Sequence, residues 1–232
     1  MTAVRVEDLW KYYGDYPALR KISFTVDAGA CMAVMGRNGA GKTTMLRILC
    51  GLSNPARGSV EVLGAPARAP ETRARVGILG HGIGIYDELS ALENLRLFGR
   101  LYGLESPDRA AGHWLERTGL DRVKDGLVRE FSRGMRQRLA VARAFLHEPK
   151  VLFLDEPFTA LDDRAIATLQ GLLRDALEEG RTVLMSTHQL RESLELATNV
   201  ALINRGRLVY TGVRTDEMLA DPGWLYRHYG EA

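Results

Sequence analysis

A glycine-rich segment of eight residues constrains this chain more than any other feature of its sequence. The segment reads Gly36-Arg37-Asn38-Gly39-Ala40-Gly41-Lys42-Thr43 and matches the pattern G-x-x-x-x-G-K-[ST] at every fixed position. An apolar run, residues 30–35, precedes it, and apolar residues at helical spacing follow it as far as Gly51. The segment is therefore predicted to join a buried strand to a helix.

A glycine loop between a strand and a helix is typical of a phosphate-binding site. Glycines lack a Cβ, so successive backbone N–H groups can turn toward one anion, and the helix start adds unpaired donors. Lys42 is placed to contact the β- and γ-phosphates, and the hydroxyl of Thr43 to bind Mg²⁺. A turn that binds nothing is the alternative, but the flanking strand and helix argue against it. The expected nucleotide-binding residues here are Gly36, Arg37, Asn38, Gly39, Ala40, Gly41, Lys42, Thr43 and Thr44.

Length and charge restrict the class of protein. The 232 residues are 46% hydrophobic, which is enough for one large α/β domain or for a core with an insert. The formal net charge of +2 gives no electrostatic argument for a nucleic-acid partner, and none is expected. The longest apolar run, residues 30–35, is far shorter than the ~20 residues that span a bilayer. Cys31 and Cys50 form no spaced metal or redox motif and are expected to be buried.

The order of the predicted elements indicates an α/β fold. Antiparallel strands are expected within residues 1–35. Short buried strands are then expected to alternate with helices, which is typical of a parallel sheet. The strands are predicted near residues 60–62, 76–79, 151–154, 182–185, 200–203 and 208–210, and the later helices near 163–179 and 189–197. We expect one domain over residues 1–232, with a nucleotide-binding core (1–84 and 148–232) and a helical subdomain (85–147).

Two adjacent acids end one of the predicted core strands. Asp155 and Glu156 follow the apolar residues 151–154 directly. Ligands of such sheets bind at the carboxyl ends of the strands, next to the phosphate loop. Asp155 is thus placed to hold Mg²⁺ through water, and Glu156 to polarise the attacking water as a general base. The alternative interpretation is that both acids are only solvated residues at a strand end. The neighbouring phosphate loop argues against it.

Taken in order, these motifs resemble the ATP-binding cassette (ABC) ATPases from Tyr13 to His188. The resemblance implies a P-loop NTPase fold, with a RecA-like core built on a parallel sheet, an N-terminal antiparallel β subdomain and an α-helical subdomain. It also implies that Tyr13 stacks on adenine, because an aromatic ring suits a flat base. Tyr12 and Tyr16 lie close enough to compete for that role.

The family's signature motif, usually Leu-Ser-Gly-Gly-Gln, matches residues 131–135. Arg133 replaces a glycine and Met135 replaces the glutamine. Ser132 can cap the helix that follows. In the family this element contacts ATP bound to a second cassette, so the resemblance implies that role for Ser132, Arg133, Gly134 and Met135. Arg133 either adds charge to the phosphate clamp or faces solvent.

Three further positions are assigned by the resemblance. Asp162 ends a segment similar to the D-loop, which crosses the dimer interface. His188 matches the switch histidine that reaches the γ-phosphate, so the implied catalytic set is Lys42, Glu156 and His188. His81 falls where the family has a glutamine that helps hold Mg²⁺. Imidazole is a poorer ligand for Mg²⁺ than the amide oxygen of glutamine. His81 therefore either contacts the metal through water, or the coupling to the membrane partner differs in this chain.

The resemblance implies an ATPase that uses ATP and Mg²⁺ to power a separate transmembrane permease. It would be peripheral, at the cytoplasmic face of the inner membrane, and would pair with a second cassette, expected to be an identical copy. Residues 82–86 and the helical subdomain are the expected docking surface. Leu79-Gly80-His81 and residues 89–95 are similar to the haem-exporter cassette of cytochrome c maturation. The signature helix instead resembles a broader group of bacterial exporters of drugs, lipids or ions.

Two other classes remain as alternatives. A soluble ABC ATPase that acts on DNA or ribosomes usually carries a long coiled coil or two cassettes, and neither occurs in this sequence. A GTPase or RecA-type motor shares the phosphate loop, but residues 132–134 and the pair Asp155-Glu156 argue against it. The C-terminal aromatics Trp224, Tyr226 and Tyr229 are expected to pack on the domain.

Overall fold

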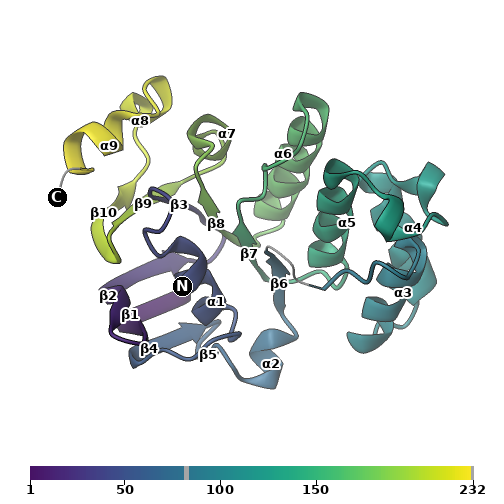
Figure 1. Ribbon diagram of the computed structural model, residues 1–232, viewed down its shortest axis with the longest axis horizontal. Coiled ribbons are helices and arrows are strands. Elements are labelled where there is room, and N and C mark those ends of the chain that lie inside the picture. Colours follow the sequence, from purple (N-terminus) through teal and green to yellow (C-terminus); the bar gives the residue numbers. More distant parts are fainter. Residues whose placement is uncertain (81–83, 231–232) are drawn as a thin grey trace.

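The computed structural model describes residues 1–80 and 84–230, which form two β-sheets and a set of helices (Figure 1). The first sheet is antiparallel and has the strand order β2-β1-β4-β5. Its strands are β1 (Thr2–Tyr13), β2 (Tyr16–Asp27), β4 (Arg57–Val62) and β5 (Ala65–Pro66). The antiparallel strands expected at the N-terminus are therefore confirmed.

The second sheet has the order β10-β9-β3-β8-β7-β6. All neighbours pair in parallel except β10, which is antiparallel to β9. Its strands are β3 (Cys31–Met35), β6 (Val76–Leu79), β7 (Val151–Asp155), β8 (Thr182–Thr187), β9 (Asn199–Asn204) and β10 (Arg207–Val213). Every residue of β3, β7 and β8 is buried, as expected for apolar runs in a sheet covered on both faces. The α/β fold is confirmed.

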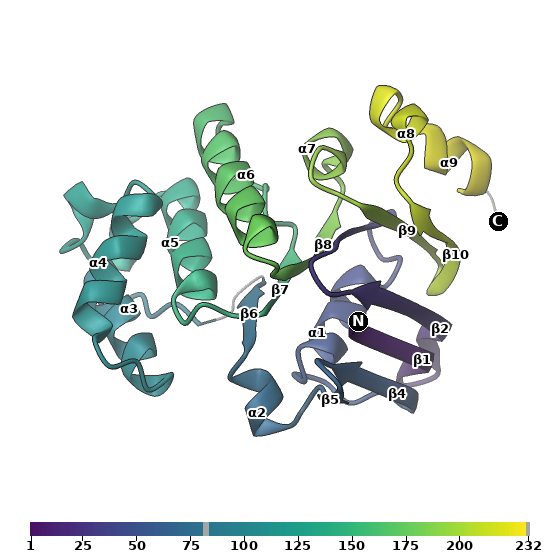
Figure 2. The same ribbon diagram turned by 180° about the vertical axis from the view of Figure 1, so that it is seen from behind.

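Helices cover both faces of this parallel sheet. They are α1 (Lys42–Leu49), α2 (Pro70–Arg73), α3 (Ala91–Leu101), α4 (Pro107–Arg117), α5 (Arg133–Phe145), α6 (Asp163–Glu178), α7 (Leu190–Leu194), α8 (Asp216–Ala220) and α9 (Trp224–Tyr229). Helix α1 lies between the two sheets, whereas α6 and α7 lie on the opposite face, and α3, α4 and α5 gather at one end (Figures 1 and 2). Within the described residues, every helix is too short or too polar to cross a lipid bilayer.

Alternation along β3 explains how both faces of the sheet are covered. Met32 and Val34 point into the cluster formed with α1 and the antiparallel sheet. Ala33 and Met35 point into a second cluster with α7, α8 and α9. Successive side chains of a strand face opposite sides, so one apolar strand serves two cores. The expected packing of the C-terminal aromatics is confirmed, since Trp224, Tyr226 and Tyr229 join this second cluster.

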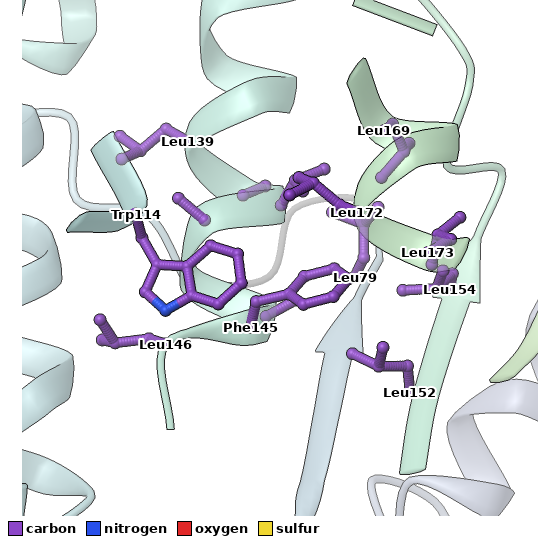
Figure 3. Packing of buried hydrophobic residues seen from close by; sticks show 14 of the residues in the cluster. Leu79, Trp114, Leu139, Phe145, Leu146, Leu152, Leu154, Leu169, Leu172 and Leu173 are labelled. Carbon is purple, nitrogen blue, oxygen red and sulfur yellow. The ribbon is translucent and has the colours of Figure 1, made fainter. Parts of the chain in front are cut away.

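A third hydrophobic cluster fixes α5 against the parallel sheet and α6 (Figure 3). Trp114 of α4 and Phe145 of α5 lie at its centre, with ring centroids 5.1 Å apart. The buried Arg143 adds a polar contact by donating to the carbonyl oxygen of Ile78 at 2.7 Å. Helix α5 is thereby held beside β6, so its N-terminus has a defined position relative to the sheet.

The structure corrects one predicted boundary. The helix expected near 189–197 covers only Leu190–Leu194. Helix α4 begins at Pro107, because proline at the first helical position loses only an N–H that would be unpaired there. A capping box begins α3, since the Ser90 hydroxyl accepts from the Glu93 N–H and the Glu93 carboxylate accepts from the Ser90 N–H.

Replacing Phe145 by alanine should lower the free energy of unfolding by about 3–5 kcal/mol, because the ring is buried at the centre of this cluster and a cavity would remain. Chemical denaturation of the purified protein measures the change. Leu101→Ala, at a side chain that is 69% exposed, is the control and should cost less than about 0.5 kcal/mol. Equal effects of the two substitutions would show that α5 is not anchored as described.

Candidate functional site

Three parallel strands bring the predicted catalytic residues to one edge of the sheet. Strand β8 lies between β3 and β7, and all three run in the same direction. The phosphate loop follows β3, Glu156 follows β7 and His188 follows β8. A cavity of about 410 Å³ lies at this edge. Its lining residues are Tyr13, Tyr16, Ala18, Asn38, Gly39, Ala40, Gly41, Lys42, Thr43, Thr44 and Glu156.

Two loop glycines are required by the close approach of neighbouring backbone. A Cβ on Gly36 would lie 2.5 Å from the carbonyl oxygen of Ile203, and one on Gly41 would lie 2.8 Å from that of Ala18. Gly39 has open space around it but a φ of +80°, which favours glycine. The β9–β10 turn supports the loop from outside, because its Gly206 N–H donates to the Ala40 carbonyl oxygen at 2.9 Å. The loop is therefore held in shape by its surroundings.

The carboxylate of Glu156 joins the other two predicted catalytic residues. Its Oε1 lies 3.7 Å from Nζ of Lys42, and its Oε2 lies 2.5 Å from Nδ1 of His188. The His188 backbone N–H also donates to Oε2, at 3.1 Å. The Lys42 and Glu156 side chains are only 7% and 12% exposed, so their attraction is weakly screened by water. Lys42 also donates to the Gly36 carbonyl oxygen at 2.7 Å.

The backbone of Glu156 adopts a left-handed conformation with a φ of +53°. This conformation costs a residue other than glycine roughly 1–3 kcal/mol and concentrates at functional sites. The Glu156 N–H donates to the carbonyl oxygen of Ser186 at 3.1 Å, which holds the turn. The strained turn directs the side chain toward Lys42 and His188 instead of continuing β7.

Asp155 and Thr43 offer oxygen ligands of the type that Mg²⁺ prefers. Both line a small cavity of about 80 Å³ beside the phosphate loop. Asp155 is buried, and one of its oxygens accepts a hydrogen bond from the Ser186 hydroxyl. Mg²⁺ is usually held by one or two protein oxygens together with waters and substrate phosphates, so these two residues fit the ion. Across residues 1–80 and 84–230, no group of three His, Cys, Asp or Glu residues could hold a metal on its own. His81 lies outside the described residues.

Two tyrosines flank the cavity beyond the phosphate loop. Tyr13 and Tyr16 face each other across the β1–β2 turn, and both side chains are more than half exposed. Nζ of Lys11 lies 5.5 Å from the centre of the Tyr13 ring. Tyr12 instead stacks on Trp10, at a centroid distance of 6.0 Å, and is not among the described residues that line the cavity. The structure thus places Tyr16, the alternative to Tyr13, at the site and adds Ala18, because a hairpin turn brings both strands to it.

The signature residues Ser132, Arg133, Gly134 and Met135 lie apart from this cavity, since none of them is among its described lining residues. Ser132 caps α5 as predicted, with its Oγ accepting from the Met135 N–H at 3.2 Å. Gln137 of the same helix donates to the Pro157 carbonyl oxygen at 3.0 Å, next to Glu156 in sequence. One chain therefore presents the start of α5 beside the Glu156 turn, not over the phosphate loop.

Asp162, the residue assigned to the D-loop, is exposed at the start of α6. Its Oδ1 accepts from the Ala165 N–H at 2.8 Å and so caps this helix. Ala160, two residues earlier, has a φ of +65° and its carbonyl oxygen lies close to Gly134. The segment that contains Asp162 therefore contacts the signature helix within the same chain.

The chain belongs to the ABC transporter family, whose sequence pattern matches residues 19–159. It is an ATP-binding cassette, an ATPase domain with the P-loop NTPase fold. A "Nod factor export ATP-binding protein I" of Cupriavidus metallidurans is 39% identical over 217 residues, 91% of this chain and 72% of the relative. A "Daunorubicin resistance ATP-binding protein DrrA3" of Streptomyces coeruleorubidus is 39% identical over 226 residues, 96% of this chain and 71% of the relative.

A solved structure gives the same result for the fold. The chain superposes on a structure described as the ATP-binding subunit of an ABC transporter with a TM-score of 0.88 and 31% identity. The match covers 97% of this chain and 98% of the other. The curated relatives are longer, and the chain spans only 63% of a second Nod factor export protein, from Cupriavidus pinatubonensis.

Removing the Tyr13 ring should weaken ATP binding about tenfold, since stacking of a base on an aromatic ring contributes ~1–3 kcal/mol. Isothermal titration of Tyr13→Ala with ATP measures the change. Tyr12→Ala removes a ring outside the cavity and is the control, with an unchanged Kd. A loss in Tyr16→Ala but not in Tyr13→Ala would transfer the stacking role to Tyr16.

Proposed function

We propose that this chain hydrolyses ATP to drive a separate membrane exporter, and that it does so as a pair of cassettes. One observation carries the proposal. Lys42, Glu156 and His188 meet at one cavity, whereas Ser132 at the capped start of α5 is not among the described residues that line it. A site that needs both this cavity and the start of α5 requires a second chain, which is expected to be an identical copy. Ser132, Arg133, Gly134 and Met135 of that copy would then close over the nucleotide.

The chemistry assigned to each residue follows from charge and position. The loop N–H groups and Lys42 would bind the phosphates, and the γ-phosphate would compete with Glu156 for the Lys42 ammonium. Glu156 would then accept a proton from the attacking water. His188 would keep the Glu156 carboxylate oriented through its contact with Oε2. Thr43 and Asp155 would hold Mg²⁺, which would supply positive charge next to the phosphate oxygens. For His81, a contact to the metal through water stays a prediction from the sequence.

The membrane partner is proposed to dock on the helical side of the chain. We place the boundary of the helical subdomain at residues 85–147 and the core at 1–84 and 148–232. Tyr86, which is 51% exposed and stacks on Phe98, lies on the segment that leads into α3. This segment and the helices α3 and α4 would receive a transmembrane permease. The chain would then be peripheral, at the cytoplasmic face of the membrane.

For the cargo, a small exported molecule is favoured, because relatives at 39% identity are named for Nod factor export and daunorubicin resistance. The candidate cargoes in this first proposal are drugs, lipids and ions. Haem export for cytochrome c maturation is a second proposal, and it rests on the similarity of Leu79-Gly80-His81 and residues 89–95 to the haem-exporter cassette. Stimulation of the ATPase by haem, in membranes that contain the partner permease, would favour haem. Stimulation by an amphipathic drug alone would favour the first proposal.

Replacing Glu156 by glutamine should reduce ATP turnover at least about 100-fold, because the general base is lost. The same variant should form an ATP-bound dimer, since the amide keeps the size of the side chain and removes its repulsion of the γ-phosphate. ATPase assays and light scattering with ATP and Mg²⁺ measure both effects.

Glu116→Gln, at an exposed position of α4, is the matched control. It should leave both ATP turnover and the molar mass measured by light scattering as they are in the parent protein. Loss of turnover without any ATP-dependent dimer would contradict the composite site. Preserved turnover in Glu156→Gln would contradict the role of this residue.

A further inference from the structure

The residues that lead into α3 are fastened to the residues that precede α5. Residues 84–90, which we call the connecting segment, end where α3 begins. Two backbone hydrogen bonds of 3.0 Å join this segment to residues 128–129, just before α5. An antiparallel bridge between Ser90 and Leu127 extends the contact. The connecting segment and the start of α5 are therefore neighbours, although they are far apart in the sequence.

A buried asparagine fixes the shape of the connecting segment. Asn94 of α3 is only 1% exposed. Its Oδ1 accepts from the Tyr86 N–H at 2.8 Å, and its Nδ2 donates to the carbonyl oxygens of Tyr86 and Ser90 at 3.0 and 2.9 Å. A buried amide whose oxygen and nitrogen are both hydrogen-bonded makes its surroundings rigid. Asp87, which follows Tyr86, is thus carried by a backbone of defined conformation.

Arg136 of α5 connects this segment to the signature residues. Its Nη1 donates to Oδ1 of Asp87 at 2.5 Å, and its Nε donates to the carbonyl oxygen of Phe131 at 3.3 Å. Phe131 directly precedes Ser132, whose Oγ caps α5. One guanidinium therefore joins the connecting segment to the residue beside the cap.

The ion pair contributes more to position than to stability. The side chains of Arg136 and Asp87 are 36% and 51% exposed, so their attraction is screened by water and stabilises the fold only weakly. Neither residue is among the described residues that line the ATP cavity. The pair can therefore influence the reaction only through the place in which it holds the start of α5.

We propose that Arg136 is a positioning residue. Held by Asp87, it keeps the start of α5 in the orientation in which Ser132 closes over ATP bound to a second copy of the chain. This inference rests on the proposed function, in which that closure completes the site. The connecting segment also belongs to the surface proposed to receive the permease, so one contact joins that surface to the signature residues.

The test is Asp87→Asn in the Glu156→Gln protein, because the amide keeps the size of the side chain and removes its charge. We expect the dissociation constant of the ATP-bound dimer to rise about tenfold, since each of two identical sites loses roughly threefold. The Kd for ATP of dilute, monomeric protein should stay within about twofold, because the pair lies outside the cavity. Tm should change by less than about 3 °C.

Light scattering over a range of protein concentrations measures the dimer, and titration with a fluorescent ATP analogue measures the monomer. Arg129→Gln is the matched control, because it breaks the neighbouring ion pair with Glu88 and leaves Arg136 in place. It should change the dimer dissociation constant by less than about twofold. Asp87→Glu keeps the charge and should restore most of the lost affinity.

An unchanged dimer in Asp87→Asn, or an equal weakening in Arg129→Gln, would overturn the proposal. A tighter dimer in Asp87→Asn would also overturn it, since Arg136 released from Asp87 would then contact the nucleotide directly. The same holds if Asp87→Glu is as weak as Asp87→Asn, or if the monomer itself loses affinity for ATP. A Glu156→Gln protein that stays monomeric with ATP would instead contradict the proposed function, and this inference with it.

Discussion

The carboxylate of Glu156 is the contact on which the organisation of this site depends. It lies between the ammonium of Lys42 on one side and the imidazole of His188 on the other, and the three residues follow three different strands. Such a meeting is possible because β3, β8 and β7 are adjacent and parallel, so their carboxyl ends share one edge. The strained backbone of Glu156 then turns the side chain into that edge.

The rest of the fold holds this edge in place. Helix α1 fills the space between the two sheets and carries Lys42 at its first position. On the other face, the cluster around Met35 joins β3 to the C-terminal helices. The Trp114 and Phe145 cluster fixes α5, so the Ser132 cap is held in a set position outside the cavity. The cavity with Lys42, Glu156 and His188 and the start of α5 with Ser132 are thus presented at separate places on one chain.

Much of this could be predicted from local sequence. The phosphate loop, the buried strands and the acids after β7 are each contained in a few consecutive residues, whose type and spacing determine their structure. The contacts with Ala18 and Ser186 could not be predicted in this way. They depend on a hairpin turn and on neighbouring strands that lie far apart in the sequence. The end of α7 at Leu194 was also missed, because short helices are decided by tertiary packing more than by local pattern.

The most direct test of the account is whether the start of α5 from one chain meets the phosphate loop of another when ATP binds. Asn38→Cys and Arg133→Cys can each be introduced into Glu156→Gln, and the two proteins mixed with a short bis-maleimide. The native Cys31 and Cys50 are buried, and burial raises the pKa of both thiols, so protein without the new cysteines is the background control. The account predicts a crosslinked dimer in the mixture that requires ATP and Mg²⁺. Crosslinking that is equal without nucleotide, or absent with it, would contradict a site shared between two chains.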